Sequence, residues 1–260
     1  MRHAKRQQMA QDAAQSQRKA KERSWALISG LAAFFFAAAL SYGGYQALMH
    51  PETPLPREWN PTVPLRISDP VTPLTGWKLN RAVATEDRCL AVLGAAATAL
   101  PLEPLEDSPQ CYIRDRIDLR GVGQAQISPL ETRCAIAVRL AMWERHSVQP
   151  AAAEILGTSV RTIDHIGSYN CRVMRTSSGP STRMSTHATA DAVDISGFGL
   201  ADGSRIRLLA DWEPAGPKAD FLREVRDGAC DWFNLTLSPD YNRLHADHFH
   251  LQSQGWGLCR

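Results

Sequence analysis

The sequence predicts an α+β fold preceded by one membrane-spanning helix. An uncharged apolar run covers residues 25–49, helical patterns follow from residue 78, and β-type segments broken by Gly, Ser and Pro dominate after residue 160. Helices that come before strands, without βαβ alternation, are typical of α+β domains. At 260 residues, 44% of them hydrophobic, the chain has room for one ordinary domain plus appendages, and wholesale disorder is excluded.

Residues 1–24 form a basic tail that we expect in the cytoplasm. Residues 1–49 hold 7 Lys and Arg against 2 Asp and Glu, which leaves 22 against 25, or −3, for residues 50–260. The larger part of the chain therefore lacks the basic surface of a nucleic-acid-binding protein, and we expect no nucleic acid among its partners.

Residues 25–49 have the length and composition of a transmembrane helix. As a helix they rise about 37 Å, enough to cross a hydrocarbon core of about 30 Å. The basic flank stays cytoplasmic, which predicts a single-pass protein of the inner membrane with its C-terminal domain in the periplasm. A signal peptide cleaved at Ala37-Ala38-Ala39 is the alternative, although a 24-residue polar leader is long for that role.

We expect residues 50–77 to form a proline-rich linker. Seven of the sixteen prolines fall there, which favours an extended, semi-rigid spacer: Pro51, Pro54, Pro56, Pro61, Pro64, Pro70 and Pro73. The alternative is a strap packed on the domain between Trp59 and Trp77, because two tryptophans rarely lie free in water.

The domain itself, residues 78–260, begins with helical signals. Residues 81–100 are rich in Ala and Leu, and residues 128–131 (Ser-Pro-Leu-Glu) read as a capping box that opens a helix. A short helix fits residues 150–155, closed by Gly157. We then expect strands at 162–166, 169–174, 192–195 and 206–209, a helix at 218–233, and a final strand at 247–252.

Six cysteines indicate disulfides and hence an oxidising compartment. None forms a C-x-x-C pair, and all follow residue 80. Fifteen connectivities are possible, and free buried thiols are the alternative to disulfides. Order along the chain suggests Cys89–Cys111, Cys134–Cys171 and Cys230–Cys259.

Two histidine clusters carry the chemistry. The first, residues 185–194, contains His187 and Asp194, and the second is His245-Ala-Asp-His248-Phe-His250. Strand alternation places the last two histidines on one face, about 6.6 Å apart. Two imidazoles and a carboxylate are a common zinc ligand set, if the chain between the first two residues folds back.

The first cluster resembles the S-x-H-x-x-G-x-A-x-D signature of the D-alanyl-D-alanine carboxypeptidase and LAS group, zinc peptidases that cut peptidoglycan stem peptides. The second resembles the H-x-x-H-x-H ending of penicillin-insensitive murein endopeptidases. The whole segment from about Cys89 to Cys259, with GSYNCR, STHATADAVDISGF, FLREVRDGAC and DHFHLQ, is similar to the bacterial extensin-like C-terminal domain family. The resemblance covers about 170 of the 260 residues.

The resemblance implies a LAS-type domain with N-terminal helices, a small antiparallel sheet and one Zn²⁺. Its ligands would be His187, Asp194 and His250. His248 would occupy the catalytic-base position, which holds Glu in many members and His in the endopeptidase branch. His245 would be a further catalytic-site histidine, either supporting the ligands from behind or facing the substrate. Ala190 replaces the signature glycine, which matters if the backbone there needs a positive φ.

Two arginines complete the expected site. Arg172 lies near an arginine position of the group and would hold a substrate carboxylate or a developing oxyanion, because a guanidinium donates two parallel hydrogen bonds. For Arg183 we favour a surface charge. The function so implied is a membrane-anchored hydrolase of an amide bond in peptidoglycan or a related envelope peptide. The alternative is a non-catalytic cell-wall-binding or structural envelope protein that keeps the metal site, and the oligomeric state stays open.

Overall fold

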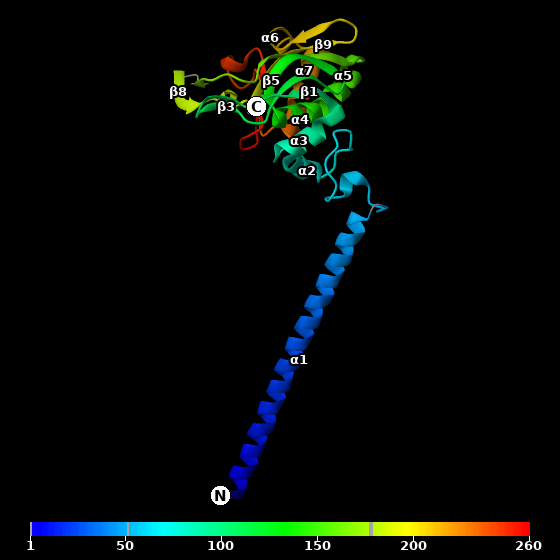
Figure 1. Cartoon of the computed structure of the whole chain (residues 1–260), viewed down its shortest axis with the longest axis vertical. Coiled ribbons are helices and arrows are strands. Elements are labelled where there is room, and N and C mark those ends of the chain that lie inside the picture. The colour runs from blue at the N-terminus through cyan, green and yellow to red at the C-terminus, as the bar shows by residue number, and fades with distance from the viewer. Residues whose placement is uncertain (1, 51, 177–178) are drawn as a thin grey trace. The chain divides into compact units, whose positions relative to one another are not determined.

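The computed structural model describes residues 2–50, 52–176 and 179–260. The chain divides into two compact units, Met1–Thr62 and Val63–Arg260 (Figure 1). Of the linker prolines, Pro51 lies outside the described residues, and the others are shared between the two units.

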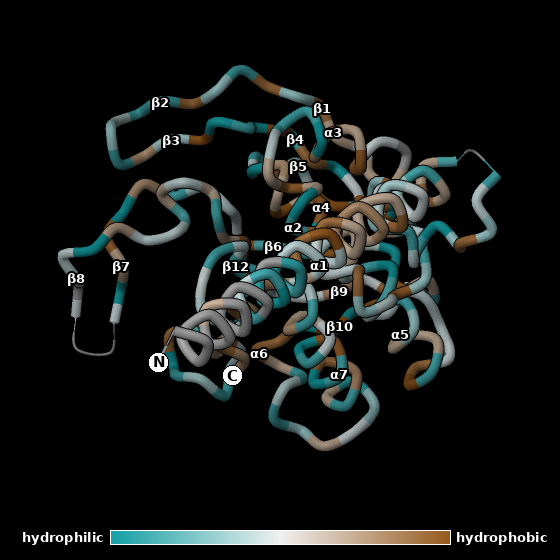
Figure 2. Tube along the Cα trace, turned by 90° about the horizontal axis from the view of Figure 1, so that it is seen from below, coloured by the Kyte–Doolittle hydropathy of each residue, from teal (hydrophilic) through white to brown (hydrophobic). Residues whose placement is uncertain are grey.

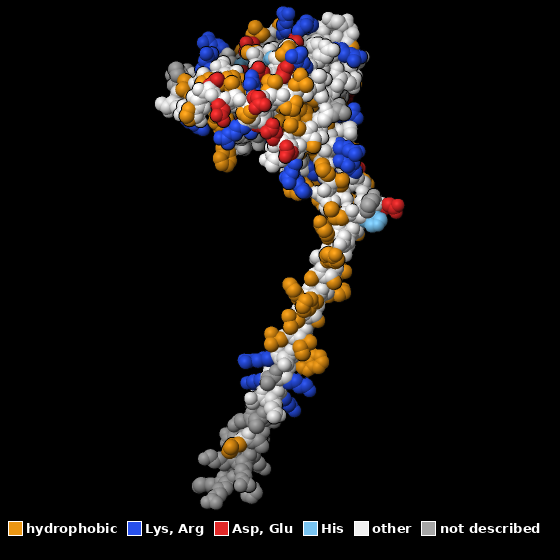
Figure 3. Space-filling view, viewed as in Figure 1, with side chains coloured by type: hydrophobic (Ala, Val, Ile, Leu, Met, Phe, Trp, Pro, Cys, Tyr) orange, Lys and Arg blue, Asp and Glu red, His pale blue; other side chains and the backbone are white. Residues whose placement is uncertain are grey.

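The first unit is dominated by helix α1 (Arg2–Met49). Within the described residues, its part from Gln15 to Met49 is the one helix long and apolar enough to cross a membrane. Figure 3 shows apolar side chains along this part of the helix and a group of Lys and Arg side chains where it begins. After a short 3₁₀ turn, Arg57–Trp59, the buried Asn60 donates through Nδ2 to the carbonyl of Leu48 at 2.9 Å. The residues after α1 therefore fold back on its end.

The second unit contains a nine-stranded mixed sheet. Eight strands follow the order β1 (Ala97–Pro101), β4 (Arg116–Val122), β5 (Ala125–Arg133), β6 (Val160–Gly167), β9 (Ala192–Leu200), β12 (Phe249–Gln252), β11 (Leu235–Leu237) and β13 (Leu258–Cys259), and β10 (Arg205–Arg207) pairs with β9. The pairs β5/β6 and β11/β13 are parallel, and the other pairs are antiparallel. The mixed α+β class is confirmed, but the sheet is larger than expected and is not purely antiparallel.

Two hairpins stand outside this sheet. They are β2 (Leu105–Ser108) with β3 (Cys111–Ile113), and β7 (Val173–Thr176) with β8 (Gly179–Met184). Both project from the same side of the domain in Figures 1 and 2, and the turn of β2–β3 is hydrophilic in Figure 2.

Helices supply the rest of the core. They are α2 (Thr75–Ala82), α3 (Glu86–Leu93), α4 (Cys134–Trp143), a π-helical turn (Glu144–Val148), α5 (Gln149–Leu156), α6 (Leu208–Asp211) and α7 (Pro217–Trp232). All ten residues of α4 are buried, and nine of them are apolar; the exception, Arg139, donates to the carbonyl of Trp232. The helix contacts α3 and α7 as well as β4 and β5. Amphipathic α7 buries one face, with Phe221, Leu222 and Val225 at its centre.

Four local predictions agree well with the structure. The strand expected at 162–166 is the central part of β6. The helix expected at 218–233 is α7, and the strand expected at 192–195 is the first half of β9. The helix expected at 150–155 is α5, and Gly157 ends it in the left-handed conformation, φ 63°.

Other local predictions were wrong where sheet pairing overrides a helical pattern. Residues 128–131 lie in β5, whose buried side chains alternate, and the helix begins only at Cys134. Pro129, which lacks an N–H group, lies beside a register shift between β4 and β5, where the missing donor is tolerated. Because α4 and α5 connect the parallel strands β5 and β6, the chain also contains a β-helix-β crossover that we did not expect.

The remaining differences are boundary errors. The expected helix at 81–100 is divided among α2, α3 and the edge strand β1, with Gly94 at φ 26° ending α3. The expected strand at 169–174 begins only at Val173, and the expected strand at 206–209 turns into α6 at Leu208. The final strand begins at Phe249, so His248 lies just before it.

The structure contains three disulfides. Cys230–Cys259 was predicted correctly, whereas the other two pairs are Cys89–Cys134 and Cys111–Cys171. Order along the chain failed there because α3 packs against α4. Cys111 in β3 instead meets the segment just after β6. Three disulfides indicate an extracellular or periplasmic setting.

Candidate metal centre

A tight turn buries the first histidine. The 3₁₀ turn Thr186–Thr189 is capped by Ser185, whose Oγ accepts from the backbone N–H of His187 at 3.3 Å. The turn ends at Ala190, which has φ 50° and ψ 29° and is the one non-glycine residue with a positive φ in the described chain. This is the conformation for which the signature glycine would be suited.

A buried ion pair anchors the end of this turn. The carboxylate of Asp191 accepts from Arg133 at 2.6 Å, from Thr189 at 2.6 Å and from Ser253 at 3.1 Å. Arg133 also bonds Asp115 at 2.6 Å. Burial opposes the charge on this guanidinium, but Asp191 and Asp115 together raise the pKa of Arg133. The turn is thereby fixed to β5 and to the end of β12.

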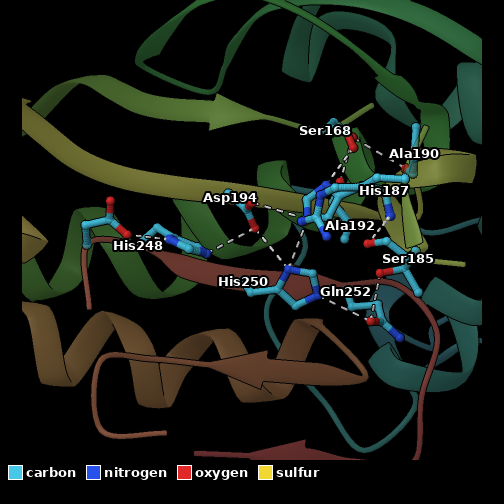
Figure 4. Close-up of polar contacts among 12 residues, drawn as sticks. Ser168, Ser185, His187, Ala190, Ala192, Asp194, His248, His250 and Gln252 are labelled. Carbon is cyan, nitrogen blue, oxygen red and sulfur yellow. Dashed lines mark hydrogen bonds and ion pairs between the residues drawn. The ribbon is translucent and has the colours of Figure 1, made fainter. Parts of the chain in front are cut away.

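Neighbouring strands supply the other two side chains. In the antiparallel pair β9/β12, His250 lies directly opposite Asp194. The reversal of the chain between His187 and Asp194 then brings all three together, as Figure 4 shows. The chain between His187 and Asp194 therefore folds back, as a metal site shared by these side chains requires.

The three candidate ligand atoms lie at metal-site spacing. His187 Nε2 is 3.2 Å from His250 Nδ1 and 3.2 Å from Asp194 Oδ2, and His250 Nδ1 is 2.9 Å from Asp194 Oδ1. Two ligand atoms that are each about 2.05 Å from a tetrahedral zinc ion would be about 3.3 Å apart. The side chains of His187, Asp194 and His250 are only 4%, 13% and 12% exposed. The donor set and its spacing fit a divalent cation.

Ser168 determines which nitrogen His187 presents. Its main-chain carbonyl lies 2.8 Å from Nδ1, and a carbonyl oxygen only accepts, so Nδ1 carries the proton and Nε2 presents its lone pair to Asp194 and His250. The Ser168 hydroxyl in turn bonds Thr132 at 2.7 Å and the carbonyl of Ala192 at 2.6 Å. Ser168 was not among the expected site residues, since nothing in its local pattern connects it to a histidine 19 residues away.

The charge of Asp194 is stabilised by its histidine neighbours. Burial by itself would raise the pKa of this carboxyl group, but its contacts with His187 and His250 hold it well below its usual range. Asp194 is therefore an anion at neutral pH, as a metal ligand must be.

His248 lies at the edge of the same cluster. Its Nε2 is 3.7 Å from Asp194 Oδ1, and its Nδ1 is 2.8 Å from the carboxylate of Asp247. The carboxylate of Asp247 can only accept, so Nδ1 is the nitrogen that donates to it, and Nε2 is the nitrogen on the side of Asp194. Asp247 was not among the expected site residues, although its place directly before His248 was a usable signal.

His245 lies beside the cluster as a neutral ring, tilted against its neighbours. Its ring centroid is 5.2 Å from that of His248 and 5.9 Å from that of His250. Burial, followed by repulsion from those two histidines, lowers its pKa to about 4. Asn242 Oδ1 already accepts from the backbone N–H of Leu244 and lies 2.9 Å from His245 Nδ1, so Nδ1 donates and Nε2 is left as an acceptor.

The two arginines lie outside the histidine cluster. The Arg172 guanidinium donates to the carbonyl of Val173 at 3.3 Å, and its own carbonyl accepts from the backbone of Ser185 at 3.0 Å. Its role toward a substrate stays a prediction. Arg183 lies on the exposed side of β8.

The comparisons with known proteins identify the family. The family model for the extensin-like protein C-terminus matches residues 87–260, or 174 of 260 residues, and the chain therefore belongs to this family. Comparison with curated proteins and with solved structures found no match.

Proposed function

We propose that this extensin-like protein is a zinc-dependent hydrolase that cleaves an amide bond in peptidoglycan or a related envelope peptide. The observation that carries the proposal is the convergence of His187, Asp194 and His250, with a free imidazole nitrogen of His248 beside them. A module that only binds a structural ion has no need of a positioned base.

His187, Asp194 and His250 hold the ion in this proposal. Zinc, when bound, supplies a Lewis acid that polarises a carbonyl group and makes water a stronger acid. His248 takes the proton of the attacking water at Nε2 and delivers it to the leaving amine, while Asp247 keeps the ring in the required tautomer. The neutral His245 accepts a hydrogen bond from a substrate N–H at Nε2, and Arg172 holds a substrate carboxylate.

In this proposal α1 anchors the protein in the inner membrane, and the domain faces the periplasm, where its wall substrate lies. The length and apolar composition of the helix support this location. The disulfides agree with this oxidising compartment.

The decisive experiment uses purified, zinc-loaded full-length protein with isolated sacculi. Released fragments are identified by mass, which names the bond, and bound metal is counted in the same preparation. We expect His248→Ala to retain zinc but to lose about 10²–10⁴-fold in turnover, because only proton transfer is removed. Asp194→Asn should lose both zinc and turnover, since it removes a charged ligand.

The matched control is His50→Ala, an exposed histidine of the first unit, which should leave both measurements unchanged. A wild-type protein that holds zinc and binds sacculi but releases no fragment would favour the wall-binding alternative. A wild-type protein without stoichiometric zinc would refute the proposal.

A further inference from the structure

Gln252 touches the metal centre from a position that the zinc chemistry does not use. It lies two residues after His250 in β12, so strand alternation places both side chains on the same face, opposite the buried Phe249 and Leu251. Its backbone pairs with Ala192 on one side and Leu235 on the other. The strand therefore holds its place independently of this side chain.

The neighbours of Gln252 determine which way its amide points. Its Nε2 donates to the carbonyl of Gln254 at 2.6 Å, and a carbonyl oxygen only accepts, so the NH₂ group must lie on that side. The amide oxygen Oε1 then faces the opposite side. There it accepts from the Thr186 hydroxyl at 3.1 Å and lies 3.4 Å from Nε2 of His250.

This orientation determines what His250 can offer an ion. Nδ1 of His250 faces Asp194 and His187, and it can bind an ion there only through its lone pair. In that form of the ring the proton lies on Nε2, where Gln252 Oε1 can accept it. The carboxylate of Asp194 competes by attracting a proton to Nδ1, and Gln252 opposes that competition from the other side of the ring.

The same amide also connects the two histidine ligands. Thr186, which donates to Gln252 Oε1, directly precedes His187 in the 3₁₀ turn. His187 is held at its outer nitrogen by a main-chain carbonyl, which no substitution removes. The corresponding contact of His250 comes from a side chain, which a substitution does remove (Figure 4).

We propose that Gln252 is a positioning residue of the metal centre: its amide oxygen holds the Nε2–H form of His250 and ties that ligand to the turn that carries His187. The inference rests on the proposed function only in that the bound ion is zinc. A protein that binds zinc but hydrolyses nothing would refute the function and leave this inference intact.

Two substitutions separate positioning from simple packing. Gln252→Met keeps the length of the side chain but removes both the acceptor and the donor. Gln252→Glu keeps an acceptor for His250 and Thr186 and loses only the bond to Gln254. We expect the Met variant to bind zinc about 10–100-fold more weakly, and the Glu variant to bind at least as tightly as wild type, because a carboxylate partner makes a histidine ligand more basic.

A spectroscopic measurement supports the affinity measurement. In zinc-loaded full-length protein with ¹⁵N-labelled histidine, the Nε2–H of His250 should be protected from exchange in wild type and in Gln252→Glu, and exposed to exchange in Gln252→Met. Gln126→Met, at an exposed glutamine of β5, is the matched control and should change neither measurement.

Should Gln252→Met fold poorly, Thr186→Val tests the same link from the other side and should also weaken zinc binding. Equal zinc affinity in wild type and Gln252→Met would overturn the inference. An equal loss of zinc affinity in the Met and Glu variants would also overturn the inference. It would mean that Gln252 acts through its hydrogen bond to Gln254, which both variants lack.

Discussion

At the residue scale, Ala190 carries the clearest conflict between local preference and site geometry. A residue with a Cβ atom is about 1–2 kcal/mol less stable in the left-handed region. Glycine would relieve that strain. However, the larger entropy of its unfolded chain would lower the free energy of unfolding by about 0.4–1 kcal/mol, and the loss of a buried methyl group would lower it by about 0.8 kcal/mol. The terms nearly cancel, which explains why alanine is tolerated at the signature glycine position.

We therefore predict that Ala190→Gly changes the free energy of unfolding by less than about 1 kcal/mol, whereas Ala190→Val lowers it by more than about 2 kcal/mol. Valine combines a β-branched side chain with a positive φ and adds volume at a fully buried position. Urea unfolding monitored by fluorescence measures both values. A Val variant as stable as wild type would mean that the turn does not adopt the left-handed conformation.

His245 gives the fold a pH dependence of defined sign. Its pKa is about 4 in the folded protein against an ordinary 6.5, so between these pH values the unfolded chain binds more protons than the folded one. Stability is therefore complete above pH 6.5 and falls as the pH is lowered toward 4. A bound divalent cation would repel a charged His245 and act in the same direction.

Between pH 6.5 and pH 4, His245 should lower the free energy of unfolding by about 1–2 kcal/mol, after allowing for screening of a half-buried ring by solvent. We predict that His245→Gln makes the free energy of unfolding less dependent on pH between 6.5 and 4. Urea titrations at a series of pH values provide the test. A variant whose pH profile matches wild type would show that His245 is not held neutral.

At the element scale, the segment after β6 is as important to the site as the strands that carry the ligands. Besides the bond from Ser168, the N–H of Asn170 donates to the carbonyl of His187 at 2.9 Å. The disulfide Cys111–Cys171 ties this segment to the β2–β3 hairpin, and Tyr169 bonds Asp107 of the same hairpin. The hairpin thereby braces the outer side of the His187 turn.

We predict that the double variant Cys111→Ala/Cys171→Ala weakens zinc binding by about 10-fold, because it releases the segment that orients His187. Its stability should fall by about 2–4 kcal/mol. The control is Cys89→Ala/Cys134→Ala, which removes the bond between α3 and α4 and should lose similar stability with unchanged zinc affinity. The prediction fails if both variants bind zinc equally well.

At the scale of the whole molecule, the 24-residue polar leader before the apolar run favours an uncleaved anchor over a cleaved signal peptide. We predict that the mature protein has the full mass of 28.7 kDa, stays with the membrane fraction in alkaline carbonate, and dissolves only in detergent. Cleavage after Ala39 would shorten the protein by roughly 4 kDa and release it from the membrane. Mass spectrometry of the membrane and soluble fractions distinguishes the two.

The sequence by itself determined the features that depend on neighbouring residues. A 25-residue uncharged run predicts a helix long and apolar enough to cross a membrane, the spacing of apolar residues specifies α7, and Gly157 ends α5. The candidate ligands His187, Asp194 and His250 were also found this way, because their residue types and spacing form recognisable patterns.

Only the tertiary structure decided which distant segments meet. Pairing with β4 made residues 128–131 a strand despite their capping pattern, and the packing of α3 on α4 selected Cys134 as the partner of Cys89. Ser168 and Gln252 bond the outer nitrogens of two histidines through contacts that leave no local mark in the sequence. Strand pairing, disulfides and hydrogen bonds between side chains are contacts across long chain separations, so their energies belong to the folded chain and not to any short stretch of it.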